Sequence, residues 1–168
     1  MTTAQQSTAG DVNADAGYTA LRDPNGFSAL GRAVSYLMTK PSFARQPFGA
    51  WSRTLTGQIN RGHYFFITSE KRIIGFVGWA LTDAEFADRW LRNSVDLPSD
   101  RCADGDCMVI NAWAADTNDA HRFALKHLRT HAVGLHAAYA KRYYADGRTR
   151  PLIVPITGVL ASHVLKQR

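Results

Sequence analysis

The sequence has little of what marks secreted, zinc-binding or membrane proteins. Its 168 residues include two cysteines, too few for a disulfide framework and without a second pair that would complete a zinc site. No run approaches the roughly 18 consecutive apolar residues of a membrane-spanning helix. The first 25 residues lack a basic start followed by an apolar stretch, so no secretory signal is expected. These absences predict a soluble, cytoplasmic protein of one domain.

Familiar catalytic signatures are missing as well. The chain contains no HExxH, no G-x-S-x-G and no P-loop. Cys102 and Cys107 are close enough for a small disulfide or two soft metal ligands, but we expect two reduced thiols in a cytoplasmic protein. His127 and His131 would share one helix face, where they are more readily explained as surface or structural residues than as ligands. No metal site is therefore expected.

The charge of the chain is unevenly spread. There are 20 Lys and Arg against 14 Asp and Glu, and residues 117–168 hold nine of the cations. A basic half attracts an acidic protein, an anionic lipid or a nucleic acid. Cations and aromatics alternate around Lys141–Tyr144 and at Arg148 and Arg150, a pattern that stacks bases. Because no nucleic-acid-binding motif accompanies it, a nucleic acid is the least favoured partner.

The apolar periodicity predicts the order of elements. Residues 1–25 read as a disordered or loosely attached tail, and residues 26–168 as one folded domain. Thr82 and Glu85 form a capping box that predicts the start of a helix. The other expected elements are helices near residues 27–40 and 51–59, a hairpin of residues 63–68 and 72–80, a strand at 107–113, a helix at 117–130 with apolar Phe123, Leu125 and Leu128, strands at 135–144 and 152–156, and a terminal helix at 159–165. This order predicts an α+β (mixed α/β) single domain with a sheet covered by helices.

Several landmarks keep a fixed spacing over some 90 residues. They are Leu30-Gly31, Pro41, Pro47, the strand end Gly75–Ala80 (GFVGWA), Gly105-Asp106 and Trp113. In this pattern the chain resembles the toxin-activating lysine-acyltransferases, the haemolysin-activating proteins that acylate RTX protoxins. The resemblance implies a GNAT-like fold with a central, mostly antiparallel sheet flanked by helices.

The resemblance also implies the reaction. The family takes a fatty acyl group from acyl carrier protein, with no bound cofactor, and transfers it to a lysine of a large secreted protein. Its members are often homodimers. The basic C-terminal half suits an acidic carrier protein. No clear Q/R-x-x-G-x-G/A loop is present to cradle the pyrophosphate of CoA, so acyl carrier protein is the expected donor.

Two family residues are replaced in this chain. The family His that follows Leu-Gly corresponds to Arg32, or to Ala33 if the helix slips by one residue. The family Asp before the strand Trp corresponds to Ala112, or to Asn111 with a shift of one. A guanidinium is no general base, although Arg32 can bind a phosphate or polarise a thioester carbonyl. Asn111 can orient a group or donate a hydrogen bond to an oxyanion.

A working enzyme then needs its base elsewhere, and position favours His63 or Asp116. We expect an acyl tunnel lined by residues such as Trp79, Phe76, Val109 and Trp113, with Arg142 and Arg148 as further substrate-binding residues. Two functions follow. One is an active N-acyltransferase with a rebuilt site, and the other is a catalytically silent homologue that binds acyl carrier protein or a secreted partner.

Overall fold

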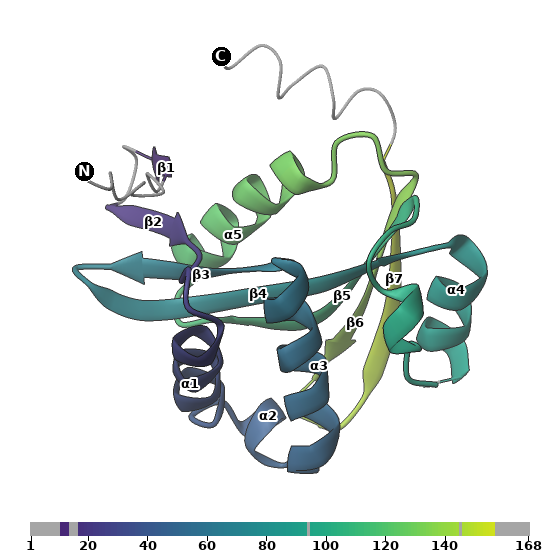
Figure 1. The fold of residues 1–168 in the computed structure, drawn as a ribbon, viewed down its shortest axis with the longest axis horizontal. Helices are drawn as coiled ribbons and strands as arrows, with labels where there is room; N and C mark the ends of the chain where they lie inside the picture. Colours follow the sequence, from purple (N-terminus) through teal and green to yellow (C-terminus); the bar gives the residue numbers. More distant parts are fainter. Residues whose placement is uncertain (1–10, 14–16, 94, 145, 157–168) are drawn as a thin grey trace, which may run out of the picture.

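A seven-stranded sheet with helices on both faces forms the framework of the computed structural model, which describes residues 11–13, 17–93, 95–144 and 146–156 (Figure 1). The strands lie side by side in chain order. They are β1 Asp11–Asn13, β2 Tyr18–Leu21, β3 Tyr64–Ser69, β4 Arg72–Thr82, β5 Cys107–Ala115, β6 Ala137–Tyr143 and β7 Thr149–Pro155. Neighbouring strands are antiparallel except for β5 and β6, which are parallel. The predicted mostly antiparallel sheet is confirmed.

The helices fill the connections that this sheet requires. They are α1 Gly26–Leu37, α2 Pro41–Ala44, α3 Phe48–Arg61, α4 Ala84–Asn93 and α5 Asn118–His131, with a short 3-10 turn at Ser99–Arg101. Asn25 caps α1 by accepting the Ser28 N–H, and Thr117 caps α5 by accepting the Ala120 N–H. Because β5 and β6 run in the same direction, their connection must cross the sheet, and α5 makes that crossing.

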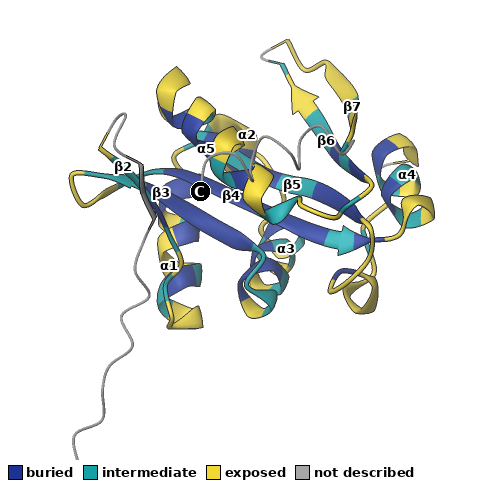
Figure 2. Ribbon diagram, turned by 90° about the horizontal axis from the view of Figure 1, so that it is seen from above, coloured by how far each residue is buried: buried dark blue, intermediate teal, exposed yellow. Residues whose placement is uncertain are grey.

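Helices cover both faces of the central strands β3, β4 and β5, whereas most of β7 is exposed (Figure 2). The helices α1, α2 and α3 pack against one face around Phe66 and Phe76, whereas α5 covers the opposite face around Phe65 and Val77. A third cluster places α4 against the end of the sheet formed by β4, β5 and β6. Alternate residues of β3 thus point into different clusters, as the two-residue period of a strand requires.

Most predicted elements are confirmed, with small shifts at their ends. The structure adds α2, which begins at Pro41, a residue favoured in the first turn of a helix. The capping box was misplaced by one residue. Thr82 is the buried last residue of β4, and Asp83 caps α4 by accepting the Phe86 N–H at 2.9 Å. Leu125 of α5 is exposed, whereas Phe123 and Leu128 are buried as expected.

The N-terminal region contains one clear difference from the sequence expectation. Tyr18–Leu21, within the expected tail of residues 1–25, pairs with β3 and buries Ala20. The alternation of apolar and polar residues in this four-residue segment was too short to predict a strand from the sequence. The terminal helix expected at residues 159–165 lies outside the described residues.

Candidate active site

A bulge separates β4 and β5 at one position. Gly78 pairs with Ala112 and Trp79 pairs with Ile110, which leaves Asn111 without a partner on β4. On its other side, the parallel pairing of β5 with β6 ends at Ile110. Asn111 therefore occupies the point at which β6 leaves β5, with no register partner on either neighbour. Figure 2 shows the β6–β7 hairpin running out past the rest of the sheet.

A buried glutamine lies beneath this bulge. Gln58 of α3 is 0% exposed, and its Nε2 donates a hydrogen bond to Oδ1 of Asn111. A Cβ atom on Gly78 would lie 2.2 Å from Gln58 Oε1, so only glycine fits above the glutamine. The Gln58 carbonyl accepts the His63 N–H at 2.9 Å, and the His63 carbonyl accepts the Trp79 N–H at 3.0 Å. These last two contacts join backbone groups. The His63 and Trp79 rings lie on the α5 face of the sheet, whereas the Gln58 amide meets Asn111 on the α3 face.

His63 has the properties of a neutral imidazole. Its ring stacks on Trp79 with centroids 5.9 Å apart and planes 9° apart. Burial, followed by the positive charges of Arg61 and Arg22, lowers the pKa of His63 below its ordinary value. Nδ1 is buried without a partner in the described residues, and no hydrogen bond among them uses Nε2. A neutral imidazole with an uncommitted nitrogen can accept a proton.

Trp79 is enclosed by further groups on the α5 face. The His131 ring lies 5.0 Å from it, and the Arg22 guanidinium lies 5.9 Å from its centroid. Arg22 Nε also donates to the Tyr64 carbonyl at 2.7 Å. Burial first, and then the charges of Arg22 and the neighbouring histidines, lower the pKa of His131 to about 4. His131 is therefore uncharged at neutral pH.

The second candidate base, Asp116, lies elsewhere. Its backbone N–H donates to the Ile74 carbonyl, five residues along β4 from Trp79, which places it roughly 16 Å from the bulge. Its carboxylate accepts the Tyr36 hydroxyl at 2.8 Å and the Lys40 ammonium at 2.5 Å. Burial, and then Asp116, raise the pKa of Tyr36. The structure thus commits Asp116 to a network that ties α1 to the sheet, away from His63.

The residues that the resemblance aligns with the family His and Asp do not form a reactive pair. Arg32 is exposed on α1 and forms an ion pair with Asp23 at 3.3 Å. Ala33 and Ala112 are both buried in the cluster between α1–α3 and the sheet. Both alanine side chains contribute only apolar packing there.

The remaining predicted residues are dispersed. Trp113 donates from its ring N–H to His121 at 2.8 Å on the α5 side. Phe76, Val109 and Trp79 belong to three separate packed clusters, so the structure does not assemble the expected tunnel from them. Arg142 and Arg148 both lie against the Tyr144 ring at the end of the β6–β7 hairpin.

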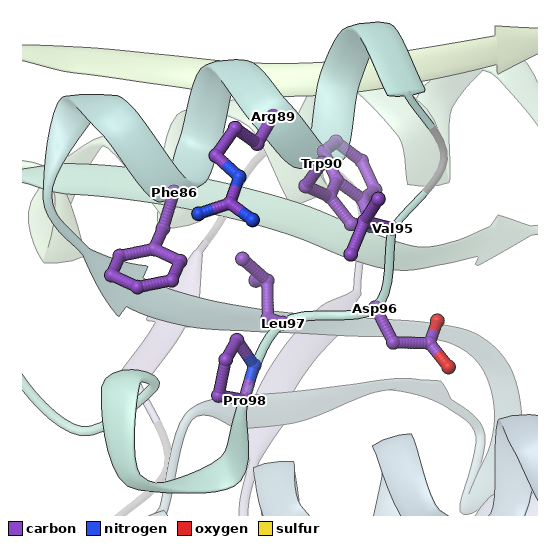
Figure 3. A pocket seen from close by; sticks show the side chains of 7 residues that line it. All are labelled: Phe86, Arg89, Trp90, Val95, Asp96, Leu97 and Pro98. Atoms are coloured by element: carbon purple, nitrogen blue, oxygen red, sulfur yellow. The ribbon is translucent and has the colours of Figure 1, made fainter.

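A pocket lies outside this set. It is a mostly apolar recess between α4 and residues 95–98, with Arg89 reaching across it toward Leu97 (Figure 3). It includes none of the predicted site residues. Among the described residues, no group of three or more His, Cys, Asp or Glu side chains is arranged to hold a metal ion. None of the helices in that part of the chain is long and apolar enough to cross a membrane.

Sequence reasoning missed Gln58 and Arg22, included Gly78 only as part of the Gly75–Ala80 landmark, and interpreted His131 as a surface or structural residue. Gln58 had a usable signal, because it falls on the apolar stripe of α3 beside Trp51, Leu55 and Ile59. A polar residue on such a stripe needs a buried partner. The contacts of the other three residues had no local signal, since they arise from the sheet register and the packing of α5.

The comparisons with known proteins agree with this architecture. The model of the RTX toxin acyltransferase family matches residues 23–149. The chain belongs to that family. The match runs from the turn before α1 to the first residue of β7 and includes Gln58, His63, Trp79 and Asn111. No curated protein matches this RTX toxin acyltransferase family member.

Two solved structures share the fold. The loading GNATL domain of CurA from Lyngbya majuscula is 14% identical with a TM-score of 0.56, and the alignment covers 75% of this chain and 65% of that domain. The GphF GNAT-like decarboxylase in complex with isobutyryl-CoA is 13% identical with a TM-score of 0.53, over 75% and 67% of the two chains. This acyltransferase family member therefore has a GNAT-like fold and spans about two thirds of these neighbours.

Proposed function

We propose that this protein transfers a fatty acyl group from acyl carrier protein to a lysine, or another amine, of a protein acceptor. The observation that carries the proposal is the partly buried His63 ring, stacked on Trp79 with its pKa lowered, within a chain of the acyltransferase family. His63 is the general base and Asn111 a hydrogen-bond donor to the thioester carbonyl. An RTX-type secreted protein as acceptor, a homodimer and a cytoplasmic location belong to the same proposal.

The reaction needs a free amine, because the ordinary lysine ammonium has no lone pair. In the proposed step His63 Nε2 takes a proton from the lysine nitrogen as that nitrogen attacks the thioester carbon. The C–N bond forms, the C–S bond breaks, and the proton passes to the departing thiolate, which leaves as a thiol. A lowered pKa supports His63 in this role, since it keeps the ring neutral before attack.

The β6–β7 hairpin supports an acidic donor. Arg142 faces Arg150 directly across the two strands, an arrangement that destabilises a strand pair unless an anion relieves it. Arg148 lies in the same end of the hairpin and pairs with Asp146 at 2.6 Å. Acyl carrier protein supplies such negative charge over a broad surface. One structural neighbour was solved with an acyl-CoA, so CoA is the donor to test beside it.

The alternative function is a catalytically silent homologue that binds acyl carrier protein or a partner. The observation that favours it is that Arg32 is ion-paired and Ala112 is packed in the core, so neither residue can act as a general base.

The test mixes the protein with fatty acyl carrier protein, or acyl-CoA of the same chain length, and a lysine-bearing acceptor, and follows intact masses. We expect the acceptor to gain the acyl mass from the carrier-protein donor. His63→Gln should slow transfer by roughly 100-fold or more, since it removes the base. The exposed His136→Gln is the matched control.

Other outcomes assign the function differently. Transfer that survives His63→Gln and is lost in Asp116→Asn would move the base to Asp116. A stable complex with the carrier protein and no transfer would support the silent homologue. If the protein shows neither acyl transfer nor a complex with the carrier protein, the carrier-protein proposal is refuted.

A further inference from the structure

We infer that Gln58 is a positioning residue for acyl transfer: it holds the Asn111 side chain so that the amide NH2 faces outward, as a donor to the thioester carbonyl oxygen. The inference rests on the proposed acyl transfer and adds a residue to it. Gln58 itself does not touch substrate in this arrangement.

The burial of Gln58 is the first support. The side chain is 0% exposed on an otherwise apolar helix face, where a buried polar group lacking a partner costs about 1–3 kcal/mol. Its Nε2 is bonded to Asn111, whereas its Oε1 has no partner within the described residues. The contact with Asn111 is therefore the one polar interaction that explains a glutamine side chain at this place.

The polarity of that contact decides which end of Asn111 is free. Because Gln58 donates, the Asn111 oxygen is turned toward α3 and the NH2 group is turned away from it. Asn111 Nδ2 makes no hydrogen bond within the described residues, and it is not one of their buried unpartnered atoms. The two protons of this amide thus remain available to a ligand.

The surroundings hold the pair in place. Asn111 has no register partner on β4 or β6, because it lies in the bulge and beyond the last paired residue of β5 and β6. Gly78 allows the Gln58 amide to lie directly against β4, and the His63 N–H holds the Gln58 backbone. Two fixed elements therefore set one orientation of the Asn111 amide without rearrangement during the reaction.

Acyl transfer needs a hydrogen-bond donor beside the thioester carbonyl oxygen. When the amine attacks, negative charge develops on the thioester oxygen, and a preorganised N–H lowers the barrier more than it strengthens binding. Removing one donor of this kind typically lowers kcat by about 100- to 1,000-fold. Loss of the group that orients the donor should have a smaller effect in the same direction.

The kinetic test is a double-mutant cycle with full-length protein, acyl carrier protein donor and lysine acceptor. We expect Asn111→Ala to lower kcat by about 100-fold and Gln58→Met by about 10-fold, with KM little changed. The double variant should be no slower than Asn111→Ala, because Gln58 acts through that side chain. The exposed Gln46→Met is the matched control. Multiplied losses in the double variant would overturn the inference.

A binding measurement tests the same point without turnover. A 13C-labelled thioester carbonyl on the carrier protein should show a lowered infrared stretching frequency when bound to the wild-type protein. That shift should disappear with Asn111→Ala and with Gln58→Met while both variants still bind the donor. A bound donor with an unshifted carbonyl would overturn this inference alone. A wild-type protein that neither binds nor uses the donor would refute the proposed function itself.

Discussion

Gly78 shows how one missing side chain can shape a site. Gly78 faces the buried Gln58 amide so closely that any Cβ would collide with it. The glycine is needed here for space, since its backbone lies in a strand rather than in the left-handed region. The position of the Gln58 amide, and through it the contact with Asn111, depends on that space.

Gly78→Ala should therefore destabilise the protein by about 1–3 kcal/mol, the usual cost of overpacking a closely packed interior. Gly31→Ala is the matched control, because a Cβ at that exposed helical position would meet nothing within 4 Å. It should stabilise α1 by about 0.5–1 kcal/mol. Urea unfolding measures both. Equal effects of the two substitutions would contradict the packing argument.

At the scale of the element, the helix cap that forms at the start of α4 differs from the one that the local sequence motif predicts. Thr82 and Glu85 have the spacing of a capping box, yet β4 extends through Thr82 and leaves Asp83 as the cap. Pairing of Thr82 with Cys107 of β5 holds it in the strand. Strand pairing thus outweighs the helix-capping preference of threonine.

Asp83→Ala should lower the free energy of unfolding by about 1 kcal/mol, since it leaves the Phe86 N–H without its partner. Glu85→Ala should change it by less than about 0.5 kcal/mol, because Glu85 is exposed and its ion pair with Arg89 is long at 3.9 Å. Denaturant titration of both variants provides the comparison. A larger loss with Glu85→Ala would restore the capping-box assignment.

The turn of the β3–β4 hairpin offers a second test at this scale. Glu70 and Lys71 have φ values of 48° and 64°, as a two-residue hairpin turn requires, but neither is the residue type that favours them. Replacing the pair with Asn-Gly should raise the free energy of unfolding by about 1 kcal/mol. Thermal unfolding checks this change. A decrease in stability would mean that the two side chains make contacts that outweigh the backbone preference.

For the whole molecule, pH couples to stability through the histidines around Trp79. The folded-state pKa of His131 is about 4, below the ordinary value near 6.5, and that of His63 is also lowered. Between those values the unfolded chain binds more protons than the folded protein, so stability is full above about pH 6.5 and falls as pH decreases toward 4.

His131→Gln should therefore flatten the pH dependence of the free energy of unfolding. We expect the difference between pH 7 and pH 4 to shrink by about 1–2 kcal/mol, because solvent screens a partly exposed ring and reduces the full linkage effect. Denaturant unfolding at several pH values measures the slope, with His136→Gln as the control. An unchanged slope in His131→Gln would contradict the burial argument.

The sequence alone determined the elements whose pattern is local. The change from helical to strand period around residue 63 predicted α3, β3 and β4, and Thr117 predicted the start of α5, because periodicity and caps act over a few neighbouring residues. The resemblance led to the family and directed attention to His63 and Asn111, whose roles stay predictions.

Only the tertiary structure decided what those residues contact. The bulge at Asn111 depends on the register between strands some thirty residues apart, and the pairing of Gln58 with Asn111 depends on where α3 lies under the sheet. The contacts of the His63 and His131 rings with Trp79 join three distant segments in the same way. Such contacts are fixed by packing of the whole chain, and no local period of the sequence carries them.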